Sequence, residues 1–135
     1  MDKRIILGGA FFLILAVSGV ARADEPIVAI EKIQPTAAVF DAATRKAPVA
    51  IRAEKEAAEF FSEDNLAKLK EQVDFENQVV LVFAWRGSGQ DKLEYAVAES
   101  SPEQIKFTLT PGRTRDLRPH IRVFVLRADV KWSLR

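Results

Sequence analysis

The chain has 135 residues, of which 48% are hydrophobic and 29% are charged, and this is enough for one domain with its own hydrophobic core. It contains no cysteine, which excludes disulfides, a thiol nucleophile and thiolate metal ligands. The formal net charge of +1 gives no general attraction to a polyanion, so we expect no nucleic-acid partner.

Residues 1–23 have the three parts of a secretory signal peptide. A basic start, Met1 to Arg4, precedes an apolar run from Ile5 to Val20, and Ala21-Arg22-Ala23 then places small residues at the −3 and −1 positions of a cleavage site. The apolar run is shorter than the roughly 20 residues of a membrane-spanning helix. We therefore expect cleavage, export to the periplasm or secretion, and no membrane span afterwards.

Charge is unevenly placed in the expected mature chain. Residues 24–103 contain 16 acidic and 9 basic side chains, whereas residues 104–135 contain 2 acidic and 8 basic side chains. Such asymmetry is typical of two halves that neutralise each other in the fold, or of a site for an anion or an acidic partner. The sequence leaves both interpretations open.

Residues 24–47 are interpreted as an N-terminal strand and a linker, and residues 48–135 as a single α+β domain. The first strand is expected at Ile27–Ile33 and a second, short one at Pro48–Arg52. Helices are expected at Glu54–Phe61, from its propensity, and at Asn65–Val73, from an amphipathic stripe of apolar residues.

The later elements are all predicted to be strands. Val79–Trp85 is a continuous apolar run, which is typical of a central strand buried on both faces. Polar and apolar residues alternate in Leu93–Val97 and in Ile105–Leu109, and Ile121–Leu126 and Val130–Leu134 add two further strands. The predicted fold is α+β: an antiparallel meander sheet of four to six strands with one or two N-terminal helices packed on one face.

Two loops concentrate polar chemistry, at Trp85–Lys92 and at Pro111–His120. Glycines in the first loop allow positive φ and close backbone approach, so its N–H groups could cradle an anion, or it could be an ordinary hairpin turn. Arginines in the second loop suit a carboxylate or phosphate, or they could pair with nearby carboxylates and fix the loop. The candidate ligand- or partner-binding residues are Arg86, Ser88, Asp91, Arg113, Arg115, Asp116, Arg118 and His120.

Strand parity predicts that these two loops meet. In a meander of strands 79–85, 93–98, 105–110 and 121–126, the first and third connections lie at the same end of the sheet. Asp91 and Asp116 would then be counter-charges for the arginines.

Enzymatic and metal chemistry find little support in these loops. The G-x-S-x-G elbow of serine hydrolases is absent, because Arg86 stands two residues before Ser88. A hydrolase built from Ser88, His120 and Asp91 or Asp116 stays only as a remote alternative. A single histidine without cysteine gives no recognisable metal-ligand pattern, so we assign no catalytic residue, cofactor or metal.

A longer segment resembles a known family. Val73-Asp74-Phe75, the apolar strand Gln78–Val82, a glycine-containing loop and Leu93–Val97 are together similar to small exported domains of the PrcB type. That family is associated with stabilising a surface protease complex. The resemblance covers roughly half of the mature chain and implies an accessory, protein-binding role.

Three functions are therefore compared. The leading hypothesis is an exported, non-catalytic binding or accessory domain that contacts an envelope or extracellular protein through the two loops. The second is an anion- or polyanion-binding protein that uses Arg86, Arg113, Arg115 and Arg118. The third is the small serine-type hydrolase.

The signal peptide gives the first testable prediction. Protein recovered from the cell envelope or medium should begin at Asp24 when its N-terminus is sequenced, because Ala21-Arg22-Ala23 is the expected cleavage site. Recovery of the exported protein with Met1 at its N-terminus would contradict this.

Overall fold

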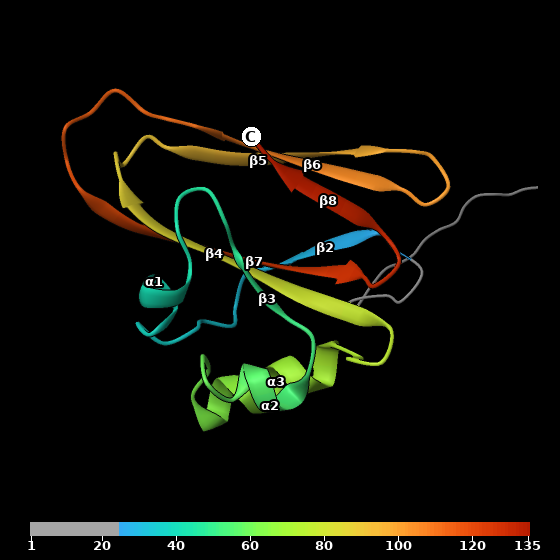
Figure 1. Ribbon diagram of the computed structural model, residues 1–135. Coiled ribbons are helices and arrows are strands. Elements are labelled where there is room, and N and C mark those ends of the chain that lie inside the picture. The colour runs from blue at the N-terminus through green and yellow to red at the C-terminus, as the bar shows by residue number, and fades with distance from the viewer. Residues whose placement is uncertain (1–24) are drawn as a thin grey trace, which may run out of the picture.

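The computed structural model describes residues 25–135, so the predicted signal peptide and its cleavage site lie outside the described residues. Helices, a four-stranded sheet and a three-stranded sheet form three successive layers (Figure 1). The helices are α1 (Val39–Ala42), α2 (Glu54–Ala57) and α3 (Glu63–Gln72). The strands are β2 (Ile27–Ile30), β3 (Val49–Ile51), β4 (Gln78–Gly87), β5 (Lys92–Ala98), β6 (Gln104–Thr110), β7 (Arg118–Arg127) and β8 (Lys131–Leu134).

The predicted α+β class is confirmed, and the four-stranded sheet is antiparallel throughout. The predicted order of a single meander is wrong. The middle sheet has the order β2-β7-β4-β3, and the outer sheet has the order β5-β6-β8, with β8 parallel to β6. β4 and β7 pair with each other because their apolar runs need cover on both faces, which only the middle layer provides.

β4, β5, β6 and β7 form one long antiparallel ribbon that is bent back on itself. In its first half β4 pairs with β7, and in its second half β5 pairs with β6. At the bend one side of the ribbon takes four residues, 88–91, and the other takes seven, 111–117. Strands with such unequal bulges can turn from one sheet into another.

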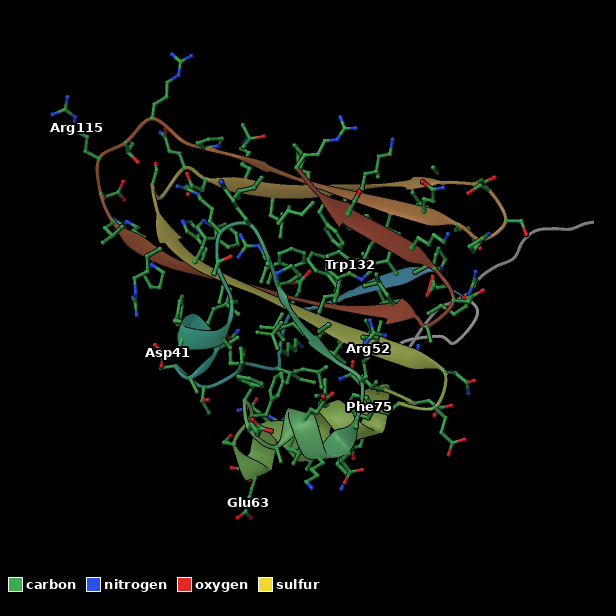
Figure 2. The ribbon with its side chains drawn as sticks, viewed as in Figure 1. Asp41, Arg52, Glu63, Phe75, Arg115 and Trp132 are labelled. Atoms are coloured by element: carbon green, nitrogen blue, oxygen red, sulfur yellow. The ribbon has the colours of Figure 1, made fainter. Side chains whose placement is uncertain are left out.

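The middle sheet is buried on both faces, as the sequence predicts for β4. Val80 and Val82 face the helices, whereas Leu81 and Phe83 face the outer sheet. The ring of Phe83 contacts two others, with centroids 4.7 Å from Phe107 and 5.8 Å from Phe124, and those two are 5.3 Å from each other. Figure 2 shows Trp132 in the space between the same two sheets.

The N-terminal part of the described chain contributes more than a strand and a linker. β2 ends at Ile30, three residues earlier than predicted, and pairs with β7 at the edge of the middle sheet. Ile33 and Val39 are buried among the residues of the helix-side core, and Val39 begins α1, which the sequence analysis did not predict because it is a single turn.

The helices are short, and α2 is shorter than predicted. The helix predicted at Glu54–Phe61 is regular only over α2, and backbone hydrogen bonds continue it as turns to Phe61. Across residues 25–135, no helix is both long and apolar enough to cross a membrane.

Truncation of the buried ring tests the packing between the sheets. Phe83→Ala should lower the free energy of unfolding by about 3–5 kcal/mol, because it leaves a cavity among aromatic rings. Denaturant melts followed by circular dichroism measure this loss. Leu117→Ala is the matched control, since Leu117 is 73% exposed and should change stability by less than about 0.5 kcal/mol. A loss below about 1 kcal/mol for Phe83→Ala would contradict the packing.

Candidate functional site

The two candidate loops meet at the bend of the ribbon, as predicted. We call residues 85–91 and 111–120 together the corner. The hydroxyls of Ser88 and Thr114 are hydrogen-bonded to each other across the bend. The Gly89 N–H donates to Oδ1 of Asp116 at 3.2 Å. The loops therefore hold each other in place through their own polar groups.

Asp91 is the buried acceptor at the centre of the corner. Its side chain is 0% exposed. Oδ2 accepts a hydrogen bond from Nε1 of Trp85 at 3.0 Å and pairs with the guanidinium of Arg45. Oδ1 accepts from the Gly112 N–H at 2.6 Å. One carboxylate thus joins β4, both loops of the corner and the segment before β3.

The electrostatics of Asp91 favour its ionised form. Burial by itself raises the pKa of this carboxyl, because its charge loses solvation. Hydrogen bonds from Gly112 and Trp85 and the positive charge of Arg45 together outweigh burial and hold the pKa below its ordinary value. The stabilisation is therefore present at pH values above the ordinary carboxyl range and is lost as the pH falls through the lowered pKa.

The glycines of the corner serve close packing. A Cβ on Gly112 would lie 2.5 Å from Oγ of Ser88 and 2.6 Å from the backbone carbon of Gln90. None of Gly87, Gly89 and Gly112 has a φ in the left-handed region, so the turn geometry does not require glycine there. Gly89 and Gly112 let the two sides of the ribbon approach each other where both leave the middle sheet, whereas Gly87 leaves room for the side chains of Asp91 and Arg45.

The anion cradle considered for the first loop is filled by the chain itself. The Gly89 N–H, which could hold an external anion, donates to Asp116 instead. Hydrogen bonds from Thr114, Gly89 and Arg118, in decreasing order of effect, lower the pKa of Asp116. Nε of Arg118 lies 2.6 Å from Oδ2 of this carboxylate. Asp116 and Arg118 are thus counter-charges for each other, as the sequence analysis allowed.

The hydrolase arrangement is not assembled. His120 Nε2 lies 2.7 Å from the backbone carbonyl of Ser88, to which it donates, whereas the Ser88 hydroxyl is bonded to Thr114. The His120 ring also stacks on Trp85, with centroids 4.8 Å apart. No carboxylate among the described residues is hydrogen-bonded to the ring, because Asp91 and Asp116 have the partners given above. His120 therefore supports the backbone of the corner.

Three of the four candidate arginines have no carboxylate partner among residues 25–135. Arg113 and Arg115 are exposed on the longer side of the bend, and Figure 2 shows the side chain of Arg115 extending away from the molecule. Arg86 is also exposed and lies over the ring of Phe40, 4.5 Å from its centroid. The corner is therefore neutralised inside and positively charged outside.

Sequence reasoning missed one participant in the corner. Arg45 lies 46 residues before Asp91, in a segment interpreted as linker, and no local pattern signals their pairing. Within the described part of the chain, no group of three or more His, Asp or Glu side chains is placed to hold a metal ion. Comparison of the chain with family models, with curated proteins and with solved structures finds no match.

Removal of the central carboxylate tests the corner. Asp91→Ala should lower the free energy of unfolding by about 2–4 kcal/mol, since it leaves buried N–H donors without an acceptor. Denaturant melts measure the loss, and Glu94→Ala, at an exposed position of β5, is the control.

The same measurement can be made against pH. The stability difference between the wild type and Asp91→Asn should shrink as the pH falls below the ordinary carboxyl range, because the wild type then loses the ionised form as well. A constant difference down to pH 2 would contradict an ionised Asp91 as the source of the stabilisation.

Proposed function

We propose that the mature chain is an exported, non-catalytic binding module that contacts an acidic surface of an envelope or extracellular protein through the exposed arginines of the corner. The observation that carries this proposal is the contrast between the carboxylates and the arginines of the corner. Its carboxylates are paired internally, while Arg113 and Arg115 are exposed without a carboxylate partner among residues 25–135.

The rigidity of the corner supports a binding role. Arg113 and Arg115 flank Thr114, whose hydroxyl is bonded to Ser88 on the other side of the bend. The Arg113 N–H is in addition within 3.4 Å of the side-chain oxygen of Gln90. A backbone already held in place loses less conformational entropy on binding, so more of the interaction energy remains as affinity.

The distribution of charge also favours an external acidic partner. Among the ion pairs formed within residues 25–135, only Arg127–Glu103 joins the acidic segment 24–103 to the basic segment 104–135. Direct pairing between the two segments therefore leaves most of the basic charge of residues 104–135 unneutralised. An excess of positive charge on one surface steers acidic partners towards it and speeds their association.

The shape of the surface favours a protein over a small anion. Arg115 extends outward from the molecule rather than into an enclosed site (Figure 2), and Arg113 is exposed as well. Leu117, two residues after Arg115 in the same loop, adds an apolar side chain that is 73% exposed. Dispersed cations around an apolar group are typical of a protein contact surface. The resemblance to PrcB-type domains points to the same class of partner.

Substitution of both exposed arginines tests the proposal. Arg113→Ala with Arg115→Ala should leave the free energy of unfolding within about 1 kcal/mol of the wild type, because both side chains are exposed. The same variant should lose at least tenfold in affinity for the partner captured from the native envelope fraction. Wild-type binding should weaken steeply with salt. The matched control is Lys55→Ala with Lys68→Ala, which removes the same charge from the exposed surface of the helical layer.

Three results would contradict the proposal. The first is equal capture by the arginine variant and the wild type. The second is equal loss in the lysine control, which would indicate an effect of net charge alone. The third is saturable binding of inorganic phosphate by the isolated wild type that the arginine variant lacks, which would favour the small-anion alternative.

A further inference from the structure

A groove runs along one side of the sandwich because the two sheets have different widths. Tyr95 of β5 packs on Phe124 of β7, with ring centroids 5.7 Å apart. The edge of the three-stranded sheet therefore ends above β7, while the four-stranded sheet continues to β2. Ala29 of β2 shares the face of Phe124 and is exposed. The resulting groove has a volume of about 660 Å³.

The walls of this groove combine apolar and charged groups. Tyr95, Phe124 and Ala29 are among its apolar residues. Arg122 lines it between Phe124 and the start of β7 at the corner. Its guanidinium donates to the neighbouring Ile121 carbonyl at 2.9 Å and has no carboxylate partner among the described residues. Glu31 and Glu94 also line the groove.

The rim of the groove is an open strand edge. Leu109 and Phe107 of β6 exchange hydrogen bonds with Arg135 beyond β8, so the odd-numbered residues of β6 direct their backbone groups away from β5. The even-numbered residues of β6 therefore bond the even-numbered residues of β5, which lie opposite them. Leu93, Tyr95 and Val97 consequently direct their N–H and C=O groups to the free edge. Within residues 25–135 these groups have no hydrogen-bond partner.

The part of this edge after Glu94 lacks the usual protection against strand pairing. Soluble proteins block free edges with charges, prolines or bulges. β5 is paired without a bulge over seven residues, and between Glu94 and Glu99 it contains neither a charge nor a proline. Tyr95 is 43% exposed and Val97 is 37% exposed, which is unusual for apolar residues that face the interior of a sandwich. The combination is typical of an edge that receives another strand.

We infer that the free edge of β5 binds an extended segment of a protein partner, which adds a fourth strand to the outer sheet above β2. Apolar side chains two residues apart on this segment would pack beside Tyr95, which lines the groove, and beside Val97, which lies further along the same edge. An acidic side chain at the corner end would pair with Arg122. Glu31 and Glu94 disfavour a segment that is acidic throughout.

A second copy of this chain does not fit the same edge. Neighbouring strands in a sheet lie about 4.8 Å apart. If two β5 strands paired, the β7 strands below them would be brought to a similar spacing, but each β7 already has β2 on that side. A single extended segment needs only the place above β2. This surface differs from the arginines of the proposed function, so the two can fail separately.

A random seven-residue peptide library displayed on phage, selected against the wild-type protein, tests the inference. Enriched peptides should share alternating apolar residues and one acidic residue. Their affinity should fall at least tenfold for Val97→Pro, which removes an N–H at the free edge without removing a bond to β6. The affinity of the peptides should also fall for Arg122→Glu, which reverses the charge in the groove. This second variant keeps the test valid if Val97→Pro fails to fold. Lys106→Glu on the outer face of β6 is the control for charge, and Arg113→Ala with Arg115→Ala should bind normally.

Several outcomes would overturn the inference. Failure to enrich any peptide against a folded wild type is one, and enriched peptides that bind both groove variants as well as the wild type are another. A concentration-dependent dimer in sedimentation experiments that Val97→Pro abolishes would assign the edge to a second copy instead.

Discussion

The bend of the ribbon depends on one buried carboxylate. Asp91 carries a charge in a place without solvent, and such a charge is tolerated only where several donors replace the lost water. The donors come from β4, from the opposite loop and from the segment before β3. Segments far apart in sequence must therefore be in place together before the carboxylate is satisfied. This requirement fixes where the ribbon leaves one sheet and enters the other.

The position of the bend determines the rest of the architecture. It places the β5–β6 half of the ribbon over the β4–β7 half, so that Phe107 meets Phe83 and Phe124. It also decides how far the outer sheet extends sideways, because β8 adds only to the far side of β6. β2 consequently has no strand above it. The groove is thus a consequence of where the ribbon folds, together with the small side chain of Ala29.

Much of this fold follows from local sequence pattern, but the pairing of strands does not. The run from Val79 to Trp85 indicates a strand buried on both faces, since no polar residue interrupts it. The same pattern does not predict whether β5 or β7 lies beside β4. A meander was therefore expected, because it is the simplest connection. The two loops were nevertheless predicted to meet, because a meander and a bent ribbon both place them at one end.

The sequence indicates which kinds of polar residue gather at the bend. It does not indicate which of these residues pair with each other. The residues around the bend were recognisable from their concentration of arginine, aspartate and glycine. Whether an arginine is neutralised depends on contacts such as that of Arg45 with Asp91, which lie 46 residues apart. No local sequence pattern predicts a contact of this kind. The glycines were correctly associated with close approach. Their φ angles show that steric space is the reason, and only the structure shows which atoms need that space.

The arginines of residues 104–135 differ in whether a carboxylate within the fold pairs with them. Arg118 and Arg127 have carboxylate partners within the fold, whereas Arg113, Arg115 and Arg122 have none among residues 25–135. Since exposed arginines contribute little to folding, their charge is available for binding. β7 leads directly from the corner to the groove, so the unpaired guanidinium groups follow one path across the molecule. A segment that pairs with β5 needs only Arg122 from this path, so the groove and the corner are separate binding surfaces although β7 connects them.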